Sequence, residues 1–310
     1  MNLDPVSLAL YQECETLLAT SLQTLSDKPE ETVASTLSAL WHAAAGKPLS
    51  VQRATDFPLT TLDINASAQL RTLLQQRIAG IPLAHLTGRQ QFMGLELQVS
   101  GDALIPREET ELLGHAALTH LQNIIREKNS ATVIDVCTGS GNLALALAHH
   151  VPLARVWAAD LSETAVALAQ RNAENLSLDD RVTFRAGDLL APFDTPEFHG
   201  KVDLLVCNPP YISSGKVDVM ASEIISHEPR LAFDGGPLGI RILQRLIAEA
   251  PRFLKASGML AFEIGLGQAR GIRKRLEQHG EYADIVEITD ARGNARALTA
   301  KHKATPTKNS

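Results

Sequence analysis

The chain has 310 residues, 45% of them hydrophobic, which suffices for two domains with a sizeable buried core. Its formal net charge of −6 argues against a large nucleic-acid interface, and no stretch approaches the ~20 apolar residues that a membrane span requires. The amino terminus carries an acid and lacks the basic and apolar pattern of a signal peptide, so we expect a cytoplasmic protein without membrane contacts.

Cysteines and basic residues give no sign of a metal or nucleic-acid site. Cys14, Cys137 and Cys207 lack metal-type spacing, and two of them fall in expected buried strands, where Cys acts as a small hydrophobe. The basic residues near the carboxyl terminus lack interleaved aromatics, and a solvated helix face with a frayed tail explains them better than a base-binding patch. They are Arg270, Arg273, Lys274, Arg275, Lys301, Lys303 and Lys308.

Residues 1–88 show helical periodicity. Apolar residues share one face in three segments, residues 8–18, 33–41 and 70–78. We expect a small helical bundle that serves substrate recognition.

Residues 89–108 are expected to form a hairpin linker. Residues 91–105 alternate in polarity, and Ser100-Gly101-Asp102 is the expected turn. Glu108 or Thr110 is suited to cap the helix that follows.

Residues 109–302 alternate between strands and helices, and residues 303–310 form an expected flexible tail. Short apolar runs at residues 133–137, 154–160, 182–187 and 202–207 are separated by helical patterns such as residues 162–176. Further on, helices at 240–254 and 268–279 flank a strand at 258–264, and strands at 282–289 and 295–299 suggest an antiparallel edge. The pattern predicts an α/β, Rossmann-like sheet of seven strands.

Polar residues follow these strands where ligands of such sheets bind. The turn Thr138-Gly139-Ser140-Gly141 follows Cys137, and its glycines permit close approach of a ligand. Asp160, about 20 residues further on, is placed to bind ribose hydroxyls. Asp188 and Leu189 end the third strand beside the expected adenine position. Two roles remain open for Asp135: bracing the turn, or binding through water the methionine ammonium group if the ligand is S-adenosylmethionine.

The glycine turn lacks the third glycine of the dinucleotide fingerprint. A nucleoside without pyrophosphate therefore fits better than NAD, and S-adenosylmethionine is the expected cofactor.

The fourth strand ends in Asn208-Pro209-Pro210-Tyr211. The two prolines stiffen the turn and remove two backbone donors, which leaves an amide, carbonyl acceptors and an aromatic ring. These groups suit a planar nitrogen carrying two N–H donors. We expect Asn208, Pro209 and Tyr211 to be catalytic, all four residues to bind the substrate, and Asn208 to border the cofactor as well.

Together these motifs resemble the protein-glutamine N5-methyltransferases of the HemK/PrmC type. The resemblance extends over most of the chain and includes residues 82–88, 92–95, 104–111, 227–231, 233–236 and 263–265. It implies methylation of the Gly-Gly-Gln glutamine of class 1 peptide-chain release factors, and it places the aromatic ring of Phe92 beside the methyl donor. His227 is interpreted as structural or substrate-positioning, because no base is required.

Two residues depart from the family pattern. Cys137 stands where Gly is usual, and Glu108 where Pro is usual. In having Cys137, the chain also resembles the methylases that act on a glutamine of a ribosomal protein. A ribosomal-protein substrate therefore remains an alternative. A DNA or RNA N6-adenine methylase, a nicotinamide-dependent oxidoreductase and a silent nucleoside-binding module are the further alternatives.

Overall fold

The computed structural model describes residues 3–22, 28–217 and 228–303. The chain divides into two compact units, the first reaching Gly101 and the second beginning at Asp102. This division falls inside the segment expected as a linker, and the hairpin belongs to the first unit. Within the described ranges, no helix is long and apolar enough to cross a membrane.

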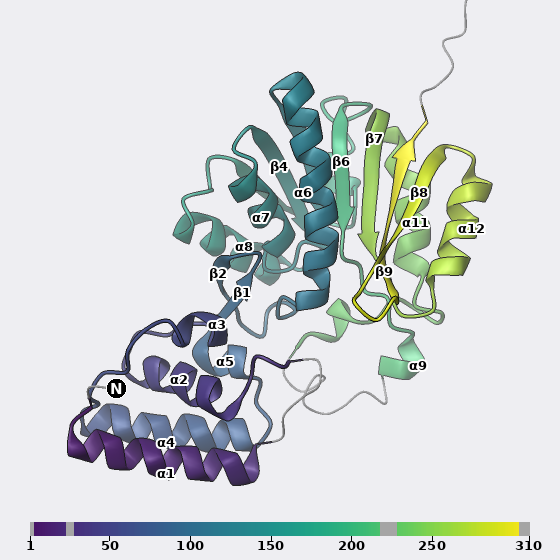
Figure 1. The fold of residues 1–310 in the computed structure, drawn as a ribbon. Coiled ribbons are helices and arrows are strands. Elements are labelled where there is room, and N and C mark those ends of the chain that lie inside the picture. Colours follow the sequence, from purple (N-terminus) through teal and green to yellow (C-terminus); the bar gives the residue numbers. More distant parts are fainter. Residues whose placement is uncertain (1–2, 23–27, 218–227, 304–310) are drawn as a thin grey trace, which may run out of the picture. The chain divides into compact units, whose positions relative to one another are not determined.

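The first unit is mainly helical, as expected (Figure 1). Its elements are α1 (Pro5–Ser21), α2 (Val33–Ala44), α3 (Val51–Ala54), α4 (Ile64–Ile78), α5 (Leu83–Thr87), β1 (Arg89–Phe92) and β2 (Leu95–Gln98). The Asp4 and Asp63 side chains cap α1 and α4 by accepting from backbone N–H groups. Leu18, Leu37 and Trp41 are fully buried, so the apolar faces read from the sequence form the core of this unit.

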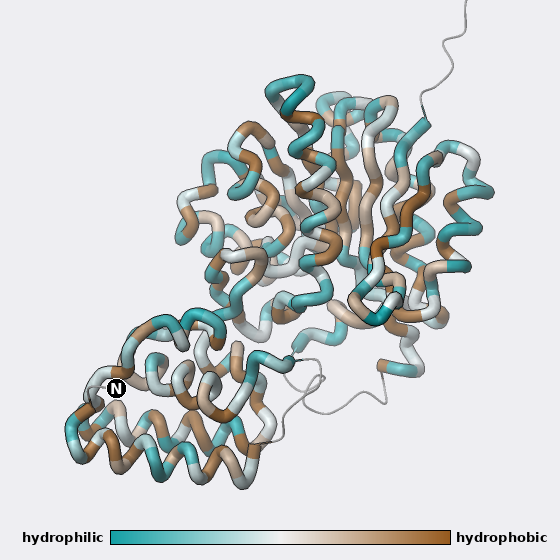
Figure 2. The backbone as a smooth tube through the Cα atoms, viewed as in Figure 1, coloured by the Kyte–Doolittle hydropathy of each residue, from teal (hydrophilic) through white to brown (hydrophobic). Residues whose placement is uncertain are grey.

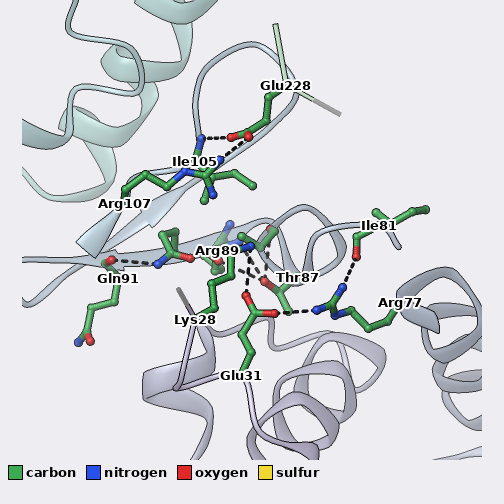
Figure 3. Close-up of polar contacts among 12 residues, drawn as sticks. Lys28, Glu31, Arg77, Ile81, Thr87, Arg89, Gln91, Ile105, Arg107 and Glu228 are labelled. Carbon is green, nitrogen blue, oxygen red and sulfur yellow. Dashed lines mark hydrogen bonds and ion pairs between the residues drawn. The ribbon is translucent and has the colours of Figure 1, made fainter. Parts of the chain in front are cut away.

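A buried ion pair joins α4 to the segment before α2 (Figure 3). Arg77 Nη2 lies 2.9 Å from Glu31 Oε2, and Nη1 donates to the carbonyl of Ile81 at 3.3 Å. Because each charge is paired inside the unit, neither remains buried without compensation.

The hairpin turn differs from the expectation. The structure places it at Met93-Gly94, between β1 and β2, and Ser100-Gly101-Asp102 lies beyond the hairpin. Met93 and Gly94 have φ values of 45° and 82°, the left-handed pair that a two-residue type I′ turn requires. Because a methionine occupies the first of these positions, the sequence did not mark the turn.

The second unit contains a seven-stranded sheet, which confirms the predicted fold class. Its strands are β3 (Ala131–Val136), β4 (Ala154–Asp160), β5 (Val182–Ala186), β6 (Val202–Cys207), β7 (Leu254–Glu263), β8 (Tyr282–Thr289) and β9 (Ala295–His302). The order is β5-β4-β3-β6-β7-β9-β8, and β9 is antiparallel to both neighbours. Apolar residues are concentrated along the central strands (Figure 2).

Helices flank this sheet and position the strand ends. The α-helices are α6 (Glu108–Lys128), α7 (Asn142–His150), α8 (Glu163–Asn175), α9 (Ser214–Val217), α11 (Arg241–Glu249) and α12 (Ala269–His279). Among the described residues of this unit, the 3-10 helices are η1 (Ala191–Phe193), η2 (Arg230–Ala232) and η3 (Ala250–Arg252). The expected capping of α6 is wrong: its cap position is Arg107, which makes no side-chain cap, and Thr110 lies inside the first turn.

The chain reverses direction across the sheet between β3 and β6. From β3 it runs outward to β4 and β5, and it then returns to pair β6 with the other side of β3. In sheets of this type, a crevice opens outside the carboxyl ends of the strands at the reversal.

Candidate functional site

A cavity of about 280 Å³ opens at the carboxyl ends of β3, β4, β5 and β6, entirely within the second unit. Nine residues predicted for the site line it: Cys137, Thr138, Gly139, Ser140, Asp160, Asp188, Leu189, Asn208 and Pro210. Arg107, Thr110, Leu231 and Arg245 are also among its lining residues. Segments far apart in the sequence therefore meet here, as the parallel topology requires.

Three residues of the turn after β3 adopt left-handed backbone conformations. Cys137, Gly139 and Gly141 have φ values of 59°, 55° and 84°. A Cβ at Gly141 would lie 3.1 Å from the Ala169 Cβ, and Gly141 does not line the cavity. Its glycine is thus required for packing against α8, whereas Gly139 faces the cavity. Cys137 occupies a conformation that favours glycine.

Asp160 bonds to the glycine turn. Its Oδ2 accepts from the Gly139 N–H and its Oδ1 from the Ser162 N–H, both at 2.9 Å. Burial raises the pKa of Asp160, and these N–H donors oppose the rise. A carboxylate offers about four lone-pair positions, so the backbone donors of Gly139, Ser162 and Leu161 leave it able to accept from a hydroxyl in the cavity.

Asp135 lies beneath the turn and outside the cavity lining. It is fully buried, and its Oδ2 accepts from the Thr138 hydroxyl at 2.5 Å. Burial raises its pKa to about 7, against the opposing effect of the bonds from Thr138 and the backbone of Ala144. Of the two roles left open, this geometry favours bracing the turn.

Of the two residues predicted for the site after β5, Asp188 lies at the surface and Leu189 lies in the core. Asp188 is exposed at the cavity rim, and Arg245 Nη1 donates to both of its carboxylate oxygens at 3.0 and 2.9 Å. Leu189 is buried and presents an apolar wall. An ion pair and an apolar surface on the same side of the cavity suit a flat heterocycle with polar edges.

A hydrogen-bonded chain leads from the cavity to a buried acid. Asn208 Nδ2 donates to Thr110 Oγ1 at 3.1 Å, and that hydroxyl donates to Glu263 Oε2 at 2.6 Å. The Tyr211 hydroxyl donates to Glu263 Oε1 at 2.9 Å. Burial raises the pKa of Glu263, and burial followed by the charge of Glu263 raises the pKa of Tyr211.

Sequence reasoning missed the roles of Thr110 and Glu263. Thr110 was assigned to a helix cap, and Glu263 entered only within a motif of the resemblance. The available signal was the position of Glu263 at the end of β7, next to β6 in the sheet.

Residues 235–239, just before α11, pack against the Asn208–Tyr211 turn. A Cβ at Gly235 would lie 2.6 Å from the Pro210 carbonyl oxygen, and one at Gly239 would lie 2.3 Å from that of Tyr211. Gln268 Nε2 also donates to the Tyr211 carbonyl, at 3.0 Å. The glycines are therefore needed for close backbone approach.

Glu228, which precedes η2, connects to the segment before α6 (Figure 3). Its Oε1 accepts from the Ile105 N–H at 2.7 Å, and its Oε2 pairs with Arg107. Arg107 and Pro229 line the cavity, so this buried carboxylate fixes one of its walls.

The other predicted site residues are not among those that line the cavity, or they fall outside the described ranges. Phe92 is fully buried in the first unit, and Pro209 is buried beside the cavity without lining it. Tyr211 also lies outside the lining, turned towards Glu263. His227 and Lys308 fall outside the described residues. Among the residues that are described, no three His, Cys, Asp or Glu gather to hold a metal ion.

Part of the basic carboxyl-terminal region is engaged in surface contacts. Arg273 pairs with Glu287 at 2.9 Å, and Lys301 pairs with Asp284 at 3.0 Å. Lys303 donates to the carbonyl of Gly280.

Comparison with known proteins agrees with this geometry. Residues 115–241 match the family described as "Methyltransferase small domain". The release factor glutamine methyltransferase of Moorella thermoacetica is 40% identical, over 76% of this chain and 80% of the relative. That of Streptomyces coelicolor is 36% identical, over 80% of this chain and 85% of the relative.

Solved structures support the fold. The human methyltransferase 10 domain containing protein superposes with a TM-score of 0.51 at 18% identity, over 67% of this chain and 88% of that one. The hMettl16 catalytic domain gives 0.52 at 15% identity, over 74% and 81%. The relatives and the family match show that the chain is a methyltransferase belonging to the release factor glutamine methyltransferase family.

Proposed function

We propose that this enzyme transfers a methyl group from S-adenosylmethionine to the side-chain amide nitrogen of the glutamine in the Gly-Gly-Gln motif of class 1 release factors. The names of its relatives support this substrate. The observation that carries the proposal is Asn208, whose carboxamide lines the cavity with its nitrogen committed to Thr110 and its oxygen left to accept.

The residues around the cavity fit the cofactor. Asp160 is left able to accept from a ribose hydroxyl, and Gly139 allows the backbone to approach the ligand closely. Leu189 and the Asp188–Arg245 pair suit the apolar faces and polar edge of adenine. S-adenosylmethionine, when bound, supplies a methyl group on a sulfonium centre.

The protein groups have to compensate for a poor nucleophile. The amide lone pair is delocalised into the carbonyl, and positive charge develops on nitrogen as the N–C bond forms and the S–C bond breaks. Asn208 Oδ1 and the Pro209 carbonyl each accept one N–H of the glutamine, which aligns the nitrogen and stabilises that charge. The Tyr211 ring packs over the amide plane. The methylated nitrogen then releases its proton to water, so the site requires no general base.

The test uses tritiated S-adenosylmethionine with a release factor, its Gly-Gly-Ala variant and ribosomal subunits. We expect label on the release factor and none on the Gly-Gly-Ala variant. Label on ribosomal protein alone would replace the proposed substrate with the ribosomal one, and label on neither would refute a glutamine substrate of either kind.

Asn208→Ala tests the catalytic assignment within the same assay. It removes the acceptor oxygen, so kcat should fall by about a hundredfold to a thousandfold. Cofactor binding measured by calorimetry should remain, because Asp160 and the glycine turn are intact. Unchanged turnover would contradict the role of the amide.

A further inference from the structure

The orientation of the Asn208 carboxamide is decisive for this chemistry. Only Oδ1 can accept an N–H of the substrate amide, whereas Nδ2 would present two donors to two donors. A rotation of 180° about the side-chain amide exchanges the two atoms with almost no change in shape. Some part of the protein must therefore select one orientation.

The donors and acceptors behind Asn208 make that selection. Ionised Glu263 only accepts, and it receives one bond from Thr110 and one from Tyr211. The single proton of the Thr110 hydroxyl is used in its 2.6 Å bond to Glu263. Thr110 can then offer only a lone pair to Asn208, and only Nδ2 can donate to it.

The groups behind Asn208 are buried, and their burial makes the preference for one amide orientation strong. Thr110 is 1% exposed and Glu263 is 2% exposed, so water does not offer these groups substitute partners. An unsatisfied donor or acceptor at such depth is costly. The flipped amide would set its Oδ1 against the lone pairs of Thr110.

We propose that Thr110 and Glu263 are positioning residues that fix the Asn208 carboxamide with its oxygen towards the substrate. This inference rests on the proposed amide-methylation function. Thr110 and Glu263 act through Asn208, whereas Asn208 itself contacts the substrate.

The direction of hydrogen-bond donation from Asn208 through Thr110 to Glu263 depends on the ionisation of Glu263. A protonated Glu263 can donate to Thr110, whose own proton then becomes available to Asn208 Oδ1, and the preferred amide orientation reverses. Burial raises the pKa of Glu263, while bonds from Thr110 and Tyr211 and the charge of Arg296 on β9 lower it, and Glu109 on α6 raises it. We therefore expect kcat to fall as the pH decreases through the pKa of Glu263.

The decisive experiment compares Thr110→Val with Thr110→Ser. Valine keeps the branched shape and removes the hydroxyl, whereas serine keeps the hydroxyl. In the release-factor assay, Thr110→Val should lower kcat about a hundredfold with little change in the KM for cofactor, and Thr110→Ser should stay within a few-fold of wild type. Equal kcat in the valine variant and wild type, or equal losses in both variants, would overturn the inference.

Two further measurements separate this inference from folding defects and from the proposed function. Selective 15N-asparagine labelling, with Asn208→Ala for assignment, should show an Nδ2 proton shifted downfield by its bond in wild type and Thr110→Ser, and not in Thr110→Val. An identical signal in all three would overturn the inference even if no substrate were methylated. Glu263→Gln removes the titrating carboxyl and should abolish the acid limb of the kcat profile; an acid limb that persists in that variant would also refute the inference.

A wild-type enzyme that labels neither release factor nor ribosome would instead refute the proposed function, leaving the amide orientation to be judged by the 15N signal alone.

Discussion

Replacing Asp135 by Asn should change how the stability of the second unit depends on pH. Asp135 is fully buried, and its pKa is raised from a usual value of 3.8 to about 7 by burial. Asparagine has nearly the same shape and can still accept from the Thr138 hydroxyl. It imitates the protonated acid at every pH.

The sign follows from proton counting. Between roughly pH 4 and 7, the carboxyl keeps its proton in the folded state and has lost it in the unfolded state. The unfolding free energy of wild type therefore falls by about 1.4 kcal/mol per pH unit as the pH rises through this window. Asp135→Asn lacks this dependence, so the variant should gain about 2 kcal/mol relative to wild type between pH 5 and pH 7, because the slope halves as the pH reaches the folded-state pKa of about 7.

Urea unfolding at several pH values measures this difference. Far-UV circular dichroism and tryptophan fluorescence should be followed together, because each unit contains one tryptophan, Trp41 or Trp157, and the two units can unfold separately. Asp180→Asn, at an exposed position before β5, is the control and should show no such gain. A difference between Asp135→Asn and wild type that stays constant from pH 5 to pH 7 would refute the burial argument.

Two further substitutions test the cavity and its backbone. Asp160→Ala removes the acceptor proposed for ribose and the partner of the Gly139 N–H, so the Kd for S-adenosylmethionine should rise at least tenfold by calorimetry; an unchanged Kd would remove that assignment. Gly239→Ala places a Cβ 2.3 Å from the Tyr211 carbonyl oxygen, so it should displace the Asn208–Tyr211 turn and lower kcat at least tenfold. Gly215→Ala, where a Cβ would meet no atom within 4 Å, is the matched control, and equal activity in both variants would contradict the close-approach argument.

The sequence sufficed for the sheet because each strand carries a strong local signal. β3 and β6 are short apolar runs bounded by Gly or Pro, and the residues at their carboxyl ends must share one edge of a parallel sheet. The antiparallel pair β8 and β9 was predicted as well. The expectation for α8 was accurate because Ser162 caps its first turn.

Features that depend on tertiary contacts were harder to predict. The turn between β1 and β2 uses Met93 in a left-handed conformation, which its type does not favour. Thr110 is of a residue type that often caps helices. In the structure its hydroxyl instead bonds to Glu263, which lies 153 residues away in the sequence. No local sequence pattern indicates such a pairing, so the contact of Thr110 and Glu263 with each other and with Asn208 could be found only in the structure.

The position of β7 between β6 and β9 has a consequence for synthesis of the protein. The loop carrying Asn208 leaves the ribosome long before Glu263 at the end of β7, and Glu228 follows Ile105 by 123 residues. Sheet pairing across such separations forms late, because long chain segments must first be closed. A nascent chain that ends after β6 would present the Asn208 turn at an open sheet edge, without its buried acid, and methyl transfer should begin only when β7 has been inserted.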